Sequence, residues 1–188
     1  MSEANAFPNL FFVLDVESIG LHGEGLAAAF CVVDGNGAER AHAVYACQPS
    51  VAQGTDDDRA WVAANVPAIT LTHQTPAAVR FALWQAWTTW RARGAVMVAD
   101  CPWPVEANFL AAAVREIGEA ARCLGPYPLI DLASVALARG SAPLERVPRL
   151  TSELPAHHPL NDARHSGRIL ADALRKFAVP VSPVARRA

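Results

Sequence analysis

The chain has 188 residues, of which 52% are hydrophobic, and a formal net charge of −2 at pH 7. This length predicts one domain with enough apolar residues for a sizeable core. The near-neutral charge excludes a broadly basic nucleic-acid coat, so any contact with nucleic acid must be local, short or assisted by metal ions.

Neither a membrane segment nor a disulfide framework is indicated. No apolar run reaches about 18 residues, the length of a membrane span, and residues 1–5 lack the basic start of a signal peptide. The four cysteines form no Cys-x-x-Cys pair, which argues against a zinc ribbon and favours free thiols. We expect a cytoplasmic protein without membrane contact, with a tail at residues 1–9, one domain over 10–178 and a disordered tail at 179–188.

Three strands are expected first along the chain. The apolar run from Leu10 to Leu14 predicts a buried strand, and residues 26–33 and 38–47 predict two more. The sequence Asp34-Gly35-Asn36-Gly37 favours a tight turn between the last two. Together these segments predict an antiparallel meander.

The later chain alternates helices and strands, which predicts an α/β fold whose antiparallel three-strand start is followed by parallel strands, flanked by helices. Thr75 and Pro76 suit the start of a long helix, and Asp131 suits the start of a shorter one. Gly140 to His158 is a proline-rich loop. The expected helices are 56–64, 75–93, 105–121, 132–139 and 160–177, and the expected strands are 95–99 and 128–130.

Aromatic residues recur every three positions in the long helix, at Phe81, Trp84, Trp87 and Trp90. This helical spacing predicts a stripe that packs in the core or at an interface. A stacking platform for nucleic-acid bases is the alternative interpretation.

The first strand delivers two acids, as Asp15-Val16-Glu17. Side chains at i and i+2 of an extended segment point to the same side, so the two carboxylates repel each other unless a cation lies between them. Mg²⁺ and Mn²⁺ prefer carboxylate oxygens and suit this position. In the alternative interpretation, Asp15 merely ends the strand and Glu17 faces solvent.

A second reactive segment stands before the last helix. Asp162 falls in the first helical turn, and His157 precedes it by five positions in the loop. A metal-binding carboxylate beside a histidine base is the pairing that phosphodiester hydrolysis needs. In the alternative interpretation, a histidine-rich loop simply leads into a helix.

Together, the two segments resemble motifs of the DEDDh 3′–5′ exonucleases, which have a ribonuclease-H-like fold. Their first motif, Asp-x-Glu commonly followed by Thr-Gly-Leu, resembles Asp15-Val16-Glu17-Ser18-Ile19-Gly20-Leu21, with isoleucine where threonine is common. Their third motif, His, four residues, then Asp-Ala, resembles the segment from His157 to Ala163. Pro128 to Leu132 is similar to the family's Ile-Asp-Thr segment, and the resemblance covers roughly residues 10–177.

The family's middle motif, Phe-Asp-x-x-Phe-Leu, is altered in this chain. Counting back from Phe109-Leu110 puts Glu106 where the family has aspartate. Asp100, at the end of the preceding expected strand, is the rival ligand. The register favours Glu106, whose extra methylene is expected to displace or weaken one of the two metal ions.

The resemblance implies a two-metal hydrolysis. Asp15, Glu17, Asp162 and the middle-motif acid would hold two Mg²⁺ or Mn²⁺ ions. His157 would be the general base, since it keeps the family's separation from aspartate and His158 does not. Ser18, Ile19 and Leu21 would hold the terminal nucleotide.

The implied partner is the 3′ end of single-stranded DNA or RNA, and the product is a nucleoside 5′-monophosphate. The resemblance and the tryptophan-rich helix are also compatible with a homodimer. His165, one turn after Asp162, is expected on the helix surface.

Two other functions remain open. In the first, the nuclease site has decayed, and the chain is a weakened or inactive exonuclease-fold protein that binds nucleic acid or acts as a scaffold. In the second, the chain is another hydrolase on a similar fold, with a small phosphodiester as substrate.

Overall fold

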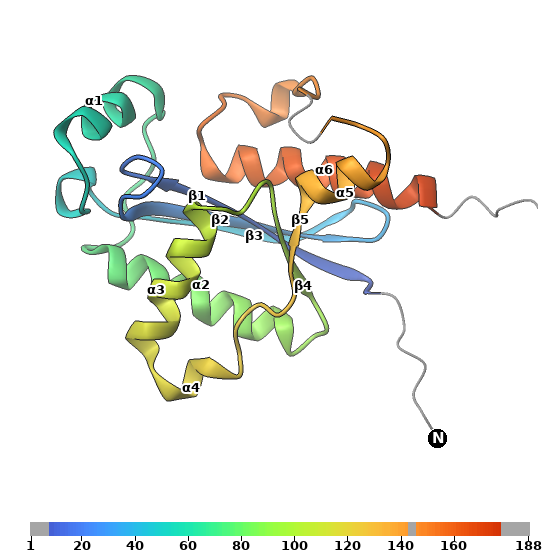
Figure 1. Ribbon diagram of the computed structural model, residues 1–188, viewed down its shortest axis with the longest axis horizontal. Coiled ribbons are helices and arrows are strands. Elements are labelled where there is room, and N and C mark those ends of the chain that lie inside the picture. Colours follow the sequence, from blue (N-terminus) through green and yellow to red (C-terminus); the bar gives the residue numbers. More distant parts are fainter. Residues whose placement is uncertain (1–7, 143–145, 178–188) are drawn as a thin grey trace, which may run out of the picture.

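The computed structural model describes residues 8–142 and 146–177. These residues form an α/β structure around one five-stranded mixed sheet, in the order β3-β2-β1-β4-β5 (Figure 1). Neighbouring strands are antiparallel from β1 to β3, whereas β4 is parallel to β1 and β5 to β4. The strands are β1 Leu10–Ser18, β2 Gly25–Asp34, β3 Glu39–Ala46, β4 Val96–Ala99 and β5 Leu129–Asp131.

The predicted α/β class, with an antiparallel start and later parallel strands, is therefore confirmed. Of the two predicted tails, only residues 8 and 9 belong to the described part of the chain, where they precede β1.

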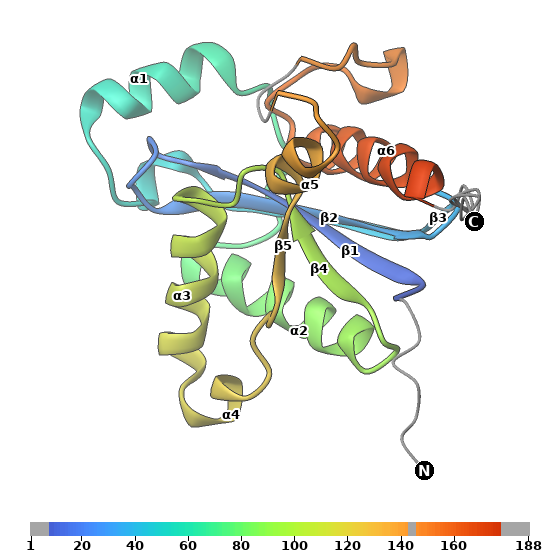
Figure 2. The same cartoon turned by 45° about the vertical axis from the view of Figure 1, so that its right-hand side comes forward.

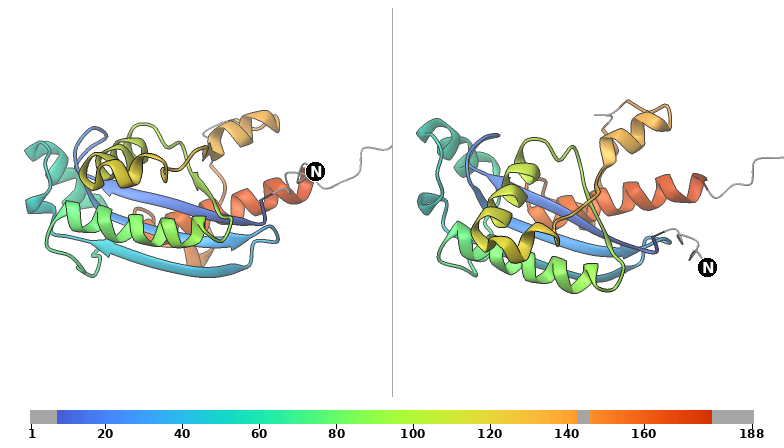
Figure 3. Two further views of the ribbon diagram at one scale, coloured as in Figure 1. Left: turned by 90° about the horizontal axis from the view of Figure 1, so that it is seen from below. Right: turned by 60° about the horizontal axis from the view of Figure 1, so that its bottom comes forward.

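Helices cover both faces of the sheet. In Figures 1 and 2, α2 and α3 lie on one face and α5 and α6 on the other, and Figure 3 shows α2 running along the sheet. None of the described helices is long and apolar enough to cross a membrane. The helices are α1 Asp56–Asn65, α2 Pro76–Arg91, α3 Val105–Ile117, α4 Glu119–Arg122, α5 Leu132–Ala138 and α6 Pro159–Phe177, with 3₁₀ turns η1 Pro49–Val51 and η2 Thr151–Glu153.

The central strand β1 contributes side chains to two apolar clusters, one on each face of the sheet. Because side chains alternate across a strand, Phe12 enters the apolar cluster under α2 and α3, whereas Phe11 and Val13 enter the cluster under α6. Asp15 and Glu17 have the same parity as Val13 and therefore lie on the α6 face. The alternation that builds the core thus also aims both carboxylates at the last helix.

The helix boundaries follow the predicted capping residues. Thr75 accepts a hydrogen bond from Ala78 N, with Pro76 at the helix start, and Asp131 caps α5 by accepting from Ala133 N. The expected helix 105–121 is instead divided at Gly118, whose φ of 79° suits glycine and ends α3.

The aromatic stripe of α2 is only partly a core stripe. Trp84 and Trp87 are buried, and the Trp87 ring meets Phe12 edge-on at 5.6 Å. Phe81 is 51% exposed, so it does not pack in the core, and its packing at an interface stays a prediction. A spacing of three falls about 60° short of a full turn at each step, because a helix has 3.6 residues per turn. Nine positions therefore place Phe81 and Trp90 on opposite sides of the helix.

Candidate metal and active site

The two acids of β1 emerge at the end of the sheet's central strand. Strand β4 ends at Ala99, which is paired with Leu14, so β1 continues beyond its parallel neighbour. Asp15 is half-buried and Glu17 is only 8% exposed. The solvent-facing alternative for Glu17 is therefore wrong.

Asp162 lies in the first turn of α6, as expected, and both of its carboxylate oxygens are engaged. Oδ1 accepts a hydrogen bond from Arg149 Nη1 at 2.7 Å, and Oδ2 accepts one from the backbone N–H of His157 at 3.2 Å. The carboxylate therefore fixes the loop that carries His157 to the start of the helix.

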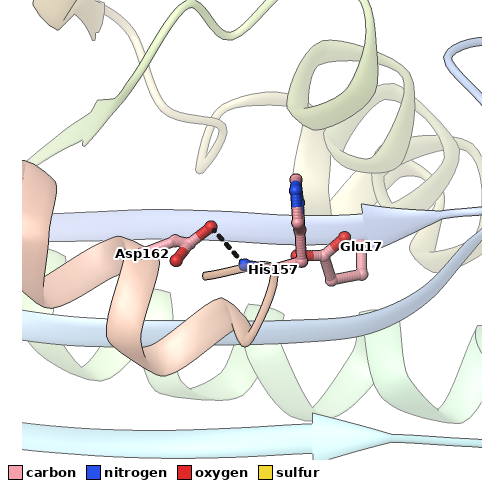
Figure 4. A group of neighbouring side chains, drawn as sticks. All are labelled: Glu17, His157 and Asp162. Carbon is pink, nitrogen blue, oxygen red and sulfur yellow. Dashed lines mark hydrogen bonds between the residues drawn. The ribbon is translucent and has the colours of Figure 1, made fainter. Parts of the chain in front are cut away.

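Glu17, His157 and Asp162 form a compact group (Figure 4). One ligand atom from each residue lies within 4.8 Å of the others. The three residues come from β1, the loop before α6, and α6 itself. Two carboxylates and an imidazole at this spacing suit a divalent cation.

His157 takes up an unusual backbone conformation at this position. Its φ is +61°, in the left-handed region that non-glycine residues seldom adopt. The side chain is exposed, and its ring meets the Trp61 ring edge-on, with 5.4 Å between the ring centroids. Strained backbone of this kind persists where the surroundings hold it, and it is frequent at functional sites.

Glu106 reaches the same end of β1 from the opposite side of the sheet. It stands in the first turn of α3, is 6% exposed, and accepts a hydrogen bond from Val16 N at 3.2 Å through Oε1. That N–H belongs to the part of β1 that extends past β4. Glu106 thereby gives the unpaired N–H at this strand edge an acceptor. It also brings a third acid beside Asp15 and Glu17.

Burial and mutual repulsion raise the pKa values of these acids. Burial is the largest cause for all three. It acts with Asp162 and Glu106 to raise the pKa of Glu17 to about 8, and it raises the pKa of Glu106 to about 7. The pKa of Asp15 is raised well above its ordinary value by burial and then by Glu106, Asp162 and Glu17. A bound cation would relieve this repulsion, so the donor set fits a hard divalent metal ion.

Asp100, the rival to Glu106, lies at the edge of this cluster. It follows β4 directly and is exposed. Of the four neighbouring carboxylates that raise the pKa of Asp15, Glu106 has the largest effect and Asp100 the smallest. The electrostatics therefore favour Glu106 as the fourth acid.

The residues after Glu17 differ in what they can contact. Ile19 is fully buried, and its side chain fills the core, so its contact with a nucleotide stays a prediction. Ser18 Oγ donates to the Gly20 carbonyl at 2.7 Å and closes the turn. Gly20 has a φ of +70°, and a Cβ there would lie 2.4 Å from Asp58 Cγ. This turn leaves Leu21 67% exposed, where a ligand can reach it.

The two neighbouring histidines lie outside this group. His158 is half-buried and does not belong to the group of Glu17 and Asp162. His165 is buried, and its Nδ1 lies 2.9 Å from Glu153 Oε2, so its predicted place on the helix surface is wrong. The physical reason is that η2 covers this face of α6.

Sequence reasoning missed two residues that touch the site, Arg149 and Trp61. Trp61 comes from α1, far along the chain from the three motifs, whereas Arg149 lies in the proline-rich loop that precedes His157. A lone arginine in a proline-rich loop carries no sequence signal for an ion pair with Asp162, because only folding brings the two segments together.

Comparison with known proteins adds no relative to this description: no protein-family model matches the chain, and no curated protein matches it.

Proposed function

We propose that the chain is a metal-dependent 3′–5′ exonuclease of the DEDDh type with a ribonuclease-H-like sheet. It removes nucleotides from the 3′ end of single-stranded DNA or RNA and releases nucleoside 5′-monophosphates. The observation that carries this proposal is the convergence of Glu17, His157 and Asp162, with ligand atoms within 4.8 Å of one another. The strand order β3-β2-β1-β4-β5 supports the proposed fold assignment.

The acids are assigned to metal binding. Asp15, Glu17, Glu106 and Asp162 would hold two Mg²⁺ or Mn²⁺ ions, which supply charge stabilisation to the phosphoryl transition state when bound. The carboxylates come from β1, α3 and α6, which are packed elements of the fold. Rigid elements of this kind keep the ligands preorganised.

His157 is assigned the proton transfer. Its exposed imidazole accepts a proton from the attacking water, whose oxygen bonds to the phosphorus of the last linkage. The bond from phosphorus to the 3′ oxygen of the preceding nucleotide breaks, and that oxygen takes a proton from solvent. The products are one nucleoside 5′-monophosphate and a strand shortened by one nucleotide with a free 3′-hydroxyl. Leu21, exposed in the turn after β1, provides an apolar surface for the terminal base.

The test is incubation of the purified protein and Mn²⁺ with single-stranded DNA and RNA labelled on the terminal nucleotide. We expect release of labelled mononucleotide and at least about a hundredfold loss in Asp15→Ala, in line with the loss caused by removing one stabilising group of a catalytic site. Absence of release from both strands, or undiminished release by Asp15→Ala, would overturn the proposal. Turnover of a small chromogenic phosphodiester without release from oligomers would instead favour the small-substrate hydrolase.

A weakened or inactive site that binds nucleic acid is the second candidate. Two observations favour it: Glu106 stands where an aspartate is expected, and Arg149 already pairs with Asp162. Titration calorimetry with Mn²⁺ separates the two candidates. Uptake that disappears in Asp15→Ala supports the nuclease, whereas no uptake supports the decayed site.

A further inference from the structure

Arg149 brings a positive charge into the carboxylate cluster. Its Nη1 donates to Asp162 Oδ1 at 2.7 Å and to the Glu153 backbone carbonyl at 3.2 Å. Among the described residues, it is the basic side chain that forms an ion pair with one of the four acids Asp15, Glu17, Glu106 and Asp162. Burial raises the pKa of Asp100, and Arg149 partly offsets that rise, so the charge of Arg149 also acts on this neighbouring acid.

The position of the guanidinium does not depend on Asp162 alone. The Glu153 carbonyl that also accepts from it belongs to η2, and the Glu153 side chain is buried and bonded to Arg168 and His165 of α6. If Asp162 bound a metal ion, this second bond would keep the guanidinium beside the site. A guanidinium held in this way can stay when a metal ion binds. It differs from a side chain that occupies the metal site and must leave before the ion can bind.

Most of the hydrogen-bonding capacity of Arg149 remains unused. A guanidinium has five N–H donors in a planar fork, and both donors of Nη1 are engaged. Nε and Nη2 donate to no acceptor within residues 8–142 and 146–177, although the side chain is only 25% exposed. Three donors in a fork, partly buried and beside a reactive site, suit an oxygen of a phosphate.

A cation beside the four acids would also complement the charge of the substrate. Two divalent ions would neutralise the four carboxylates, but they would leave nothing to offset the negative charge of the phosphodiester that approaches. Arg149 supplies one further positive charge at that point. A cation that meets the charge on a transferring phosphoryl group is a recurrent device of phosphoryl transfer.

We propose that Arg149 binds a non-bridging oxygen of the 3′-terminal phosphodiester, the linkage that is cleaved, through its Nε and Nη2 donors. This inference rests on the proposed function and adds a substrate-binding residue to it.

The test measures binding rather than turnover. Affinity for a 5′-labelled single strand is measured by fluorescence anisotropy with Ca²⁺ in place of Mn²⁺, on ice, with the strand checked to be intact. Arg149→Gln is expected to weaken binding about tenfold, the lower range for one charge-assisted hydrogen bond. It should also reduce the slope of log affinity against log salt by about 0.7, the value for one phosphate contact on a single strand.

Three controls accompany this variant. Arg149→Lys keeps the charge and should retain the salt slope while recovering part of the affinity. Arg146→Gln removes an equal charge from an exposed position in the same segment and should leave both affinity and slope near wild type. A strand whose 3′-terminal linkage is an uncharged methylphosphonate should bind wild type about tenfold more weakly, yet bind Arg149→Gln no worse than the natural strand does.

The outcomes separate this inference from the proposed function. If wild type binds the strand and Arg149→Gln binds it with an unchanged slope, the role of Arg149 is overturned and the nuclease proposal stands. If Arg149→Gln keeps the salt slope of wild type and binds Mn²⁺ at least tenfold more tightly, Arg149 instead competes with the metal ion for Asp162. If wild type binds no strand, both proposals fall.

Discussion

Carboxylates that face one another at the end of β1 are costly to the fold without a counter-charge. Glu17 and Glu106 are both less than 10% exposed, and the surrounding acids add repulsion to the cost of burial. A stable protein retains such residues where a cation or proton compensates them. Their presence in a well-packed sheet is therefore the strongest argument at the scale of residues for a metal site.

The middle-motif acid can be identified by isosteric substitution. Glu106→Gln keeps an oxygen to accept from Val16 N but removes the charge, so Mn²⁺ affinity should fall by at least about tenfold, the lower range for even an outer partner of a metal ligand. Asp100→Asn, the matched control at the exposed rival position, should have a smaller effect. Calorimetry of both variants measures the difference, and a larger loss in Asp100→Asn would reverse the assignment.

At the scale of elements, the segment before α6 is held by one buried acid. Glu153 accepts from Leu150 N at 2.9 Å and from Arg168 Nη2 at 2.8 Å, and its side chain is 3% exposed. The hydrogen bond from Arg168 is the main reason that the pKa of Glu153 is lowered to about 2. This network ties η2 to the helix and so positions both Arg149 and the loop of His157.

We expect Glu153→Gln to lower the free energy of unfolding by about 3 kcal/mol at pH 7, near the cost of leaving a buried ion pair incomplete. The folded-state pKa lies below the ordinary 4.5. The advantage of wild type is thus complete above about pH 4.5 and is lost as the pH falls towards 2. Urea unfolding of both proteins at several pH values measures this difference.

Asp172→Asn is the control for this prediction, since it breaks the exposed ion pair with Arg175 on the same helix. Its cost should be at most about 1 kcal/mol, as for other surface pairs. Equal losses in Glu153→Gln and Asp172→Asn would show that the Glu153 network does not anchor α6.

At the scale of the whole molecule, the cluster of buried acids links stability to pH. The folded-state pKa values of Glu17 and Glu106, about 8 and about 7, exceed the ordinary 4.5. Without metal, the folded protein therefore holds more protons than the unfolded chain between about pH 4.5 and 8. The free energy of unfolding should fall as the pH rises through this range, by about 1.4 kcal/mol per pH unit for each proton.

Thermal unfolding in EDTA at pH 5.5 and pH 8 tests this prediction. Tm should be lower at pH 8, and added Mn²⁺ should raise Tm more at pH 8, where the carboxylates need not first release protons. Glu17→Gln should reduce both the pH dependence and the effect of Mn²⁺. A Tm in EDTA that is equal or higher at pH 8 would contradict the linkage.

The fold was largely predictable because its signals are local. The apolar run of β1, the Asp34 turn between β2 and β3, and the Thr75 and Asp131 caps each depend on residues close together in the chain. The structure departs from simple helical periodicity at two positions. Phe81 continues a spacing of three but turns away from the sheet, and the helix expected to reach residue 121 ends at Gly118, which closes α3.

By itself, the sequence determined the α/β class, the common face of Asp15 and Glu17, and the position of Asp162 in a helical first turn. These follow from strand alternation and helix capping, which act over a few residues. Tertiary structure alone decided that Glu106 raises the pKa of Asp15 more than Asp100 does, that Ile19 and His165 are buried, and that Arg149 pairs with Asp162. The physical reason is that burial and electrostatic repulsion depend on distances between segments that meet only when the chain folds.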